Sequence, residues 1–328
     1  MPNDVLSAAL KELAAGRDLT EAEARLVLLE IMGGRASDAQ TGALLSALRV
    51  KGETAEEIVG MARAMTELAE KVEVDADVIL DTCGAGVTVA KHGNRSATSR
   101  CGSADVLEAL GVAIDLPPAL VSRCIAECGI GFMFAPRHHL AMKHVAPVRR
   151  QMGMATTFNL IGPLTNPAGA RHQLIGVADA RYVERIARAV RLMGADRNLV
   201  VHSEDGLDEI STTCPTFVVE VFAGQGFDVR YEVSPEEFDL PRANLDDLRG
   251  GDAAENAAHV RAVLDGVPGP RLDIVLLNAG AALFIAEAAG SIAEGVVKAR
   301  EAVQSGAARA KLDTLVATTR RLHDEDAA

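Results

Sequence analysis

Residues 78–95 read VILDTCGAGVTVAKHGNR, with two short apolar runs, Val78–Asp81 and Val87–Ala90, and cations directly after the second run. Short apolar runs bounded by turn residues predict buried strands. Similar runs alternate with helical patterns along the following chain, which is typical of an α/β fold with a mostly parallel central sheet. A hairpin is expected from Thr216–Ala223 and Asp228–Val233, on either side of a glycine-rich turn. The other predicted strands are Leu174–Val177, Leu199–His202 and Ile274–Asn278, and the predicted helices are Ala104–Leu110, Ala119–Cys128, Tyr182–Met193, Ala253–Asp265 and Ile292–Gln304.

The chain before residue 72 has a different pattern, with apolar residues at helical spacing in short segments. Thr20, Ser37 and Thr54 each stand where a helix N-cap belongs, and Glu57 completes a capping box with Thr54. We therefore predict a small helical domain over residues 1–71 and a larger α/β domain over residues 72–328. The predicted helices of the first domain are Ser7–Ala15, Thr20–Met32, Ser37–Lys51 and Thr54–Leu68.

Composition narrows the class of protein. The chain of 328 residues has 33 Lys and Arg against 46 Asp and Glu, a net charge of -13. Such a charge disfavours nucleic acid and anionic membrane surfaces as partners. The five cysteines are irregularly spaced, which argues against a disulfide framework, and Cys124 and Cys128 are expected on one buried helix face. No signal sequence and no apolar run of about 18 residues is found, so we expect a cytoplasmic protein.

The segment after Val87–Ala90 is rich in groups that bind anions. It reads Lys91-His92-Gly93-Asn94-Arg95-Ser96-Ala97-Thr98-Ser99 and leads, through Gly102 and Ser103, into a helix expected near Ala104. Backbone N–H groups, hydroxyls and a helix N-terminus suit a phosphate, and ligands bind at the ends of parallel strands. The segment is compatible with a phosphate site, but from the pattern alone a solvated polar loop is the favoured interpretation.

A second polar segment is Asn159–Pro167, in which glycine and prolines predict a rigid turn carrying Asn and Thr side chains. Arg149 and Arg150 precede it, and an arginine can bind a carboxylate through two hydrogen bonds. From spacing alone, a structural turn preceded by one polar helix face is the favoured interpretation. That face would also carry His138, His139, Lys143 and His144.

Four carboxylates crowd the loop after Leu199–His202. They are Glu204, Asp205, Asp208 and Glu209. Mg²⁺ prefers oxygen ligands and usually keeps waters and substrate phosphates beside one or two carboxylates. The loop could therefore hold magnesium, but from the pattern alone an acidic, helix-capping surface loop is the favoured interpretation. A cationic and an acidic cluster at strand ends would together suit a Mg-pyrophosphate ligand.

These motifs, in this order, resemble the signature segments of anthranilate phosphoribosyltransferase. The resemblance rests on Lys91–Arg95, Gly102–Asp105, Phe158–Pro167, Asp205–Glu209 and Asn278–Gly280, and it extends over almost the whole chain. It implies a small helical domain, a larger α/β domain of the nucleoside phosphorylase and phosphoribosyltransferase type, and a homodimer joined through the helical part. It also implies transfer of a phosphoribosyl group from phosphoribosyl pyrophosphate (PRPP) to the amine of anthranilate, with Mg²⁺, in tryptophan biosynthesis.

The family's site residues can be transferred position by position. Anthranilate would contact Gly84, Asn94 and Arg149, with Arg149 facing its carboxylate. Asp208 and Glu209 would bind Mg²⁺. No general base is assigned, because an aromatic amine is largely neutral at pH 7. The PRPP site would consist of Gly84, Lys91, His92, Gly93, Asn94, Arg95, Ser96, Ala97, Thr98, Ser99 and Ser103.

One part of the family pattern is missing. The family has a Gly-Thr-Gly-Gly-Asp-Gly loop and a helix that opens with Asn-x-Ser-Thr, whereas this sequence runs Asp81-Thr82-Cys83-Gly84-Ala85-Gly86-Val87. Neighbouring parallel strands need a crossover of about a dozen residues. We therefore hypothesise that the protein carries the segment between Gly84 and Ala85. A peptide spanning an unbroken Cys83–Gly84–Ala85 junction would show a true deletion, which predicts a poorly folded or inactive enzyme.

Three alternatives remain, of which one is a purely structural dimer, in which the Lys91 and Asp208-Glu209 clusters would have no role. A pyrimidine nucleoside phosphorylase also breaks a bond at ribose C1, but Lys91–Arg95 and Asn159–Pro167 match its pattern less well. A non-catalytic binding paralogue is the alternative if the glycine-rich loop is truly deleted.

Overall fold

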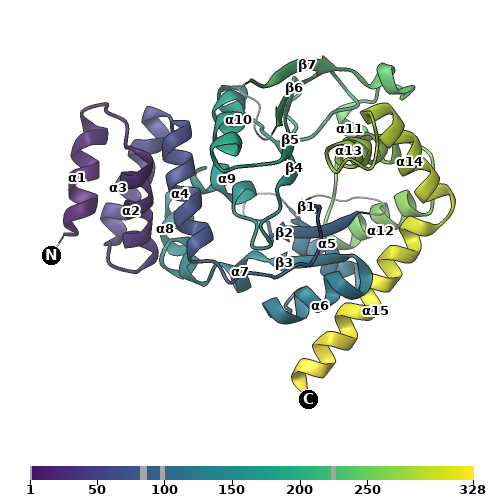
Figure 1. Cartoon of the computed structure of the whole chain (residues 1–328), viewed down its shortest axis with the longest axis horizontal. Helices are drawn as coiled ribbons and strands as arrows, with labels where there is room; N and C mark the ends of the chain where they lie inside the picture. Colours follow the sequence, from purple (N-terminus) through teal and green to yellow (C-terminus); the bar gives the residue numbers. More distant parts are fainter. Residues whose placement is uncertain (1, 82–86, 97–99, 223–226) are drawn as a thin grey trace.

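The computed structural model describes residues 2–81, 87–96, 100–222 and 227–328. Figure 1 shows a group of N-terminal helices on one side and a larger part, in which helices surround a sheet, on the other. Residues 69–78, which form neither helix nor strand, connect the two parts. None of the helices in the described ranges has the length and apolar character needed to cross a membrane.

The N-terminal helices begin at the predicted caps. The Thr20 and Thr54 side chains accept hydrogen bonds from the backbone N–H groups of Glu23 and Glu57, and each pair forms a capping box. Ser37 caps the third helix in the same way, through the N–H of Gln40. Each such cap stabilises a helix by about 1 kcal/mol. The predicted helices are confirmed as α1 (Asp4–Ala14), α2 (Glu21–Met32), α3 (Asp38–Lys51) and α4 (Ala55–Glu67).

The described strands form one sheet in the order β3-β2-β1-β4-β5-β6-β7. The pairs from β3 to β5 are parallel, and the last two pairs are antiparallel. This confirms the mostly parallel sheet and the appended hairpin of β6 and β7, whose turn at 223–226 is outside the described residues. The strands are β1 (Ile79–Asp81), β2 (Thr88–Gly93), β3 (Ile130–Phe134), β4 (His172–Gly176), β5 (Arg197–Ser203), β6 (Thr216–Phe222) and β7 (Val229–Val233).

Different helices cover the two faces of the sheet. On β5, Val200 belongs to a core formed with α10 (Val183–Leu192) and the N-terminal helices, whereas Leu199 and Val201 belong to a core formed with α13 (Pro270–Ile285) and α14 (Ile292–Gln304). This alternation is that of a strand buried on both faces. A third core joins β2 and β3 to α5 (Ser103–Leu110), α6 (Pro118–Cys128) and α15 (Ala307–Ala327). The N-terminal helices thus share a core with part of the α/β region.

One strand prediction is wrong. Ile274–Asn278 lies inside α13, a helix of 16 residues that is buried on several sides. A helix buried on all sides has a nearly continuous apolar sequence, which periodicity cannot distinguish from a buried strand. Conversely, strand β3 was not predicted. It lies at the edge of the sheet and pairs in parallel with β2.

The polar segment from residue 135 to 165 is also folded differently from the prediction. The expected polar helix face is broken into α7 (Ala135–His138), η1 (Leu140–His144) and α8 (Ala146–Met152), and both His138 and His139 are buried. The expected rigid turn contains two helical turns, α9 (Phe158–Ile161) and η2 (Gly162–Leu164). Here η1 packs against α2, and α8 packs against α3. The segment from residue 140 to 152 therefore packs against the N-terminal helices.

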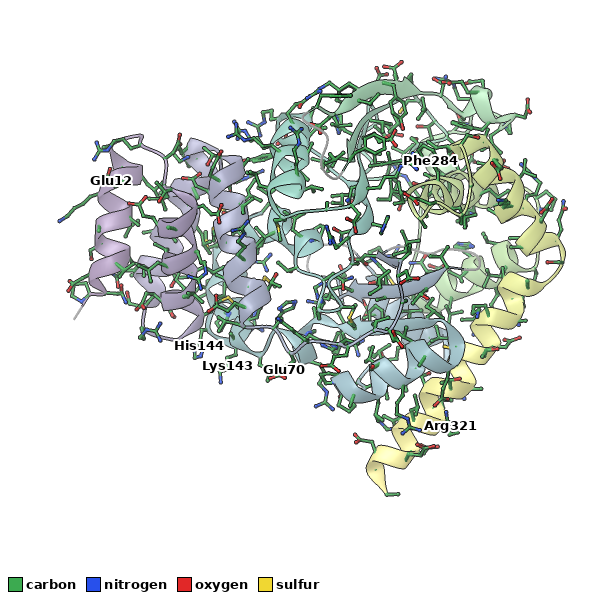
Figure 2. All side chains as sticks on the ribbon, in the orientation of Figure 1. Glu12, Glu70, Lys143, His144, Phe284 and Arg321 are labelled. Carbon is green, nitrogen blue, oxygen red and sulfur yellow. The ribbon has the colours of Figure 1, made fainter. Side chains whose placement is uncertain are left out.

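The connection between the two parts is held by backbone and imidazole groups. The Glu70 N–H donates to the His138 carbonyl at 2.8 Å, and His138 Nδ1 lies 2.9 Å from the Glu70 carbonyl. In the view of Figure 2, the labels of Glu70, Lys143 and His144 stand near the lower end of α4. The burial of His138 is therefore explained by its contact with the connecting segment.

The remaining elements complete the α/β part. Cys124 and Cys128 are free thiols, 3.7 Å apart and buried on α6, which confirms the buried helix face. Figure 2 places Arg321 on α15, where it pairs with Glu127 of α6. The other elements are η3 (Ala180–Tyr182), η4 (Pro235–Phe238), α11 (Leu245–Leu248) and α12 (Ala253–Leu264).

Candidate active site at the carboxyl edge of the sheet

The cationic segment begins inside β2 rather than after it. Strand β2 extends to Gly93, so Lys91 and His92 occupy its carboxyl end, next to the end of β1. Lys91 Nζ lies 3.6 Å from a carboxylate oxygen of Asp81, and the His92 N–H donates to the same carboxylate at 3.3 Å. Asp81 is buried, and these two contacts link the end of β1 to the end of β2. Lys91 remains partly exposed.

The loop after β2 is shaped by Asp105 of α5. Its carboxylate accepts hydrogen bonds from the N–H groups of Ser96 and Gly102, at 3.3 and 2.9 Å, and from Arg95 at 2.8 Å. Arg95 also binds Glu108. A Cβ on Gly102 would lie 2.4 Å from the Ser96 nitrogen, so only glycine allows this close approach. Arg95 is thus engaged by two carboxylates, and Lys91 is the less constrained cation.

Ser103 and Asn94 lie at the start of α5, where the helix N-terminus favours an anion. Ser103 Oγ donates to the Asn94 carbonyl at 3.4 Å, and the Asn94 side chain accepts from the Arg95 N–H at 2.7 Å. An open groove of about 530 Å³ adjoins the loop and is lined by Arg95, Ser96 and Arg100 together with Asp105, Glu108, Ala109 and Ala253. The predicted site residues Gly84, Ala97, Thr98 and Ser99 are outside the described part of the chain.

Arg149 projects from α8 toward the turn that precedes α9. Its guanidinium donates to Asn159 Oδ1 at 3.2 Å and stands 5.1 Å from the centre of the Phe158 ring. Within the described residues it has no carboxylate partner, and its Nε is buried without a hydrogen-bond partner. Burial lowers the pKa of Arg149 from its ordinary value, although so basic a group stays charged. This half-buried guanidinium can bind a carboxylate from a ligand.

Two histidines lie together beside the same turn. The rings of His92 and His139 are edge to face, with centres 5.0 Å apart. His92 Nε2 and both ring nitrogens of His139 are buried without a hydrogen-bond partner of normal geometry in the described ranges. Burial, followed by the charge of Lys91, lowers the pKa of His92 to about 4. Burial, followed by the neighbouring His92, lowers the pKa of His139 to about 3, so both rings are neutral at pH 7.

His139 is a candidate site residue that the sequence did not indicate, because its position in a polar run suggested a solvated face. Buried polar groups usually have partners, and exceptions concentrate at functional sites. His92, His139, Arg149 and Thr156 all have an unpartnered buried atom, and all lie in or against residues 156–165. The sequence could not indicate these atoms, because burial and the lack of a hydrogen-bond partner depend on the tertiary structure.

The two buried histidines predict a pH-dependent stability. Below about pH 6.5 the unfolded chain protonates both imidazoles while the folded chain does not, so the free energy of unfolding falls as pH falls. The loss is about 1.4 kcal/mol per histidine for each pH unit between 6.5 and the folded-state pKa values. Chemical denaturation at pH 7, 6 and 5 measures it. His139→Gln is expected to reduce the slope between pH 6.5 and 5, while His92 and His138, whose pKa burial also lowers, maintain the remainder. An unchanged slope would contradict this assignment.

The acidic loop is positioned between β5 and α13. Both Asp208 and Glu209 are exposed, and the Ser203 hydroxyl at the end of β5 donates to the Glu209 carbonyl. Asn278 of α13 donates to the Ile210 carbonyl at 2.8 Å and accepts from the Ile210 N–H at 3.0 Å. Desolvation, followed by the charge of Asp208, raises the pKa of Glu209. Two carboxylates held side by side repel each other, which a bound cation would relieve.

Close packing explains why this loop reaches the sheet. A Cβ on Gly176, at the end of β4, would lie 1.6 Å from the Asp208 carbonyl oxygen, so the loop rests directly on the glycine backbone. Because β1, β2, β4 and β5 are parallel, their carboxyl ends share one edge of the sheet. Lys91 and the Asp208–Glu209 pair therefore border the same edge, where ligands bind in open α/β sheets.

Comparison with known proteins gives a consistent result. The model of the glycosyl transferase family helical bundle domain matches residues 7–69, and that of the glycosyl transferase family a/b domain matches residues 75–309. The chain is 53% identical to an anthranilate phosphoribosyltransferase of Rubrobacter xylanophilus, over 97% of this chain and 98% of that one. It is 50% identical to that of Thioalkalivibrio sulfidiphilus, over 95% and 98%.

Solved structures agree. The anthranilate phosphoribosyltransferase of Thermus thermophilus is 44% identical, with a TM-score of 0.87, over 95% of this chain and 99% of that one. That of Saccharomyces cerevisiae in complex with PRPP and Mg has a TM-score of 0.87 over 97% and 99% of the two chains, at 23% identity. At 23% identity, the comparison with the Saccharomyces cerevisiae enzyme shows that the two chains share a fold.

The alignments also show a difference in length between this chain and its relatives. The alignment with the Rubrobacter protein has 340 positions, and 97% of this chain of 328 residues fills only about 318 of them. At least about 20 positions of that relative therefore have no counterpart here, and the Symbiobacterium thermophilum alignment of 343 positions, covering 98% of this chain, gives a similar difference. A loop with a crossover helix is of this length.

Proposed function

The chain belongs to the anthranilate phosphoribosyltransferase family, and on that premise we propose which of its residues bind each substrate. The reaction transfers the phosphoribosyl group of PRPP to the amine of anthranilate, giving N-(5-phosphoribosyl)anthranilate and pyrophosphate, in tryptophan biosynthesis. The family match over both parts of the chain favours this activity over a nucleoside phosphorylase or a non-catalytic paralogue.

Anthranilate binds to Arg149 and Asn94 in this proposal. The observation that carries it is that the Arg149 guanidinium has no carboxylate partner among the described residues. A carboxylate placed there would receive charge-assisted hydrogen bonds from a guanidinium whose Nε has no acceptor among the described residues and whose hydrogen bond to Asn159 involves a neutral amide. The neutral rings of His92 and His139 lie against each other and close to Gly162 and Thr165. Neutral imidazoles do not repel the positive charge that develops on the sugar as pyrophosphate leaves.

PRPP binds along Lys91–Ser99 and Ser103, with Gly84, at the carboxyl ends of β1 and β2. The support is the accessible ammonium of Lys91, the start of α5 and the adjoining groove. Within this segment Arg95 stabilises the conformation of the loop, because its guanidinium already forms ion pairs with Asp105 and Glu108. Lys91 would stabilise the negative charge of the pyrophosphate as it leaves ribose C1.

Asp208 and Glu209 hold Mg²⁺ in this proposal. No group of three or more metal-binding side chains is found among the described residues, so a protein-only metal cage has no support in them. An adjacent pair of carboxylates instead fits an ion that completes its shell with water and substrate phosphates. Mg²⁺ bound there supplies positive charge to the pyrophosphate. The amine is neutral at pH 7, so binding it close to C1 supplies much of the remaining catalysis without a general base.

The activity is tested by the fluorescence of anthranilate, measured against time with the purified chain, PRPP and Mg²⁺. A loss of fluorescence that requires all three components supports the proposal. If a folded protein causes no loss, anthranilate binding is then measured by calorimetry, and the absence of both would overturn the proposed function.

Removal of the proposed metal ligands gives a separate prediction. Glu209→Gln should lower the affinity for Mg²⁺ in the presence of PRPP at least about tenfold, whereas Glu204→Gln, an exposed carboxylate of the same loop, should leave it within about twofold. Because Glu209 has a raised pKa, protons compete with the metal, and the Mg²⁺ affinity of the unmodified chain should fall as pH falls through that pKa. Calorimetric titration with Mg²⁺ and PRPP measures both effects, and equal losses in the two variants would contradict the assignment.

We further propose a homodimer joined through the helical part, residues 1–71. Its support is the family resemblance and the exposed apolar side chains of Leu26 and Val50, on α2 and α3. Light scattering would then give twice the chain mass of 34.4 kDa, and a monomer mass would reject it. The cytoplasmic location stays a prediction.

A further inference from the structure

A fully buried carboxylate lies between the N-terminal helices and the α/β part. Glu53 follows Gly52 in the turn between α3 and α4, and none of its side chain is exposed. Buried carboxylates are costly unless they are well hydrogen-bonded or paired with a cation. In the described chain, no lysine or arginine forms an ion pair with the Glu53 carboxylate. Its position therefore needs an explanation from its hydrogen bonds.

Both carboxylate oxygens of Glu53 receive hydroxyl groups from far along the chain. Thr157 Oγ1 donates to one oxygen and the Tyr182 hydroxyl donates to the other, each at 2.7 Å. The Tyr182 hydroxyl in turn accepts from Arg49 at 2.8 Å, and Arg185 donates to the Glu53 carbonyl at 3.0 Å. Glu53 is thus the central acceptor of a network that joins the helical part to two separate segments of the α/β part.

One branch of this network leads to the proposed anthranilate site. Thr157 is fully buried and immediately precedes α9. Next to it, the Thr156 N–H donates to Asn159 Oδ1 at 3.0 Å, and Arg149 donates to the same oxygen at 3.2 Å. The Asn159 N–H closes the turn on the Thr156 carbonyl at 2.8 Å. The turn that Glu53 anchors is therefore the turn that orients Arg149.

We propose that Glu53 is a positioning residue for anthranilate: by binding Thr157 it fixes the Thr156–Asn159 turn and thereby the direction of the Arg149 guanidinium. This inference rests on the proposed function. It assigns to the N-terminal helical part a role in substrate affinity, because Glu53 acts from between α3 and α4. A carboxylate suits this task, since it accepts two hydroxyls at once and its burial excludes competing water.

The test uses three variants of the full chain and measures anthranilate binding by calorimetry. Thr157→Val keeps the side-chain shape and removes the hydroxyl, and it should weaken anthranilate binding about tenfold. Glu53→Gln can still accept from Tyr182 and donate to the Thr157 hydroxyl, so it should stay within about threefold of the unmodified chain. The matched control is Glu57→Gln. Glu57 is also fully buried, but its side-chain partners in the described part of the chain are Leu19, Lys51 and Thr54, all of the helical part.

The outcomes separate the inference from a merely structural role. Circular dichroism first establishes that each variant is folded at the temperature of the titration. A structural role alone predicts that Thr157→Val and Glu57→Gln lose stability but bind anthranilate equally well, and that result would overturn the inference. If the unmodified chain does not bind anthranilate at all, the proposed function fails instead.

Discussion

Insertion of the family's glycine-rich loop and Asn-x-Ser-Thr helix between Gly84 and Ala85 is expected to accelerate phosphoribosyl transfer by roughly 10³-fold or more over the 328-residue chain. The reason lies in the sheet. Strands β1 and β2 are parallel neighbours, with Ile79 paired to Thr88, so residues 82–87 alone must return the chain from the end of β1 to the start of β2. The inserted segment would supply that crossover and further N–H donors for the pyrophosphate.

The rates are compared by the fluorescence of anthranilate, at equal concentrations of folded protein. A control chain receives a Gly/Ser-rich insert of the same length, which relieves the short connection but adds no phosphate-binding motif. It should gain stability without most of the activity. If the 328-residue chain already turns over as fast as the chain with the family segment, then Lys91, Ser103 and the acidic loop suffice, and the prediction is wrong.

Replacement of Arg149 by alanine is expected to weaken anthranilate binding about 100-fold, which corresponds to about 3 kcal/mol. The guanidinium is half-buried, lies over the Phe158 ring and is held by Asn159, so it is already oriented for a ligand carboxylate. Arg149→Lys should recover only part of the affinity, because an ammonium cannot make two parallel hydrogen bonds to a carboxylate. Arg150→Ala, at the exposed neighbouring position, is the control and should change binding less than about twofold.

A second ligand makes this prediction specific. Aniline has the amine and ring of anthranilate without the carboxylate, so it should bind the unmodified chain and Arg149→Ala equally weakly. Calorimetry of both ligands with both proteins isolates the contribution of the carboxylate. If Arg149→Ala weakened the binding of both ligands by the same factor, the arginine would act on the shape of the pocket and not on the carboxylate.

Close packing of two helices depends on residues that carry no chemistry. A Cβ on Gly295 of α14 would lie 2.2 Å from the Gly280 carbonyl oxygen of α13. The same helix α13 carries Asn278, which holds the loop of Asp208 and Glu209 through Ile210. The placement of the acidic pair thus depends on a helix that the sequence pattern predicted in part as a strand.

The sequence by itself determined the features that arise from neighbouring residues. The helices that start at Thr20, Ser37 and Thr54 were predicted because a cap and its partner are three residues apart. The hairpin of β6 and β7 and the buried face of Cys124 and Cys128 follow from local periodicity in the same way. The family motifs likewise indicated Lys91, Arg149 and Asp208 from short stretches of chain.

Only the tertiary structure decided which polar residues lose contact with water. His139 and Glu53 stand in polar stretches that suggest a solvent-exposed face, and both are buried because segments far along the chain close over them. The same holds for Ile274–Asn278, where packing on several sides selects a helix from an apolar run that suits either structure. Burial is a property of the assembled layers, and no local pattern encodes which distant groups will cover a side chain.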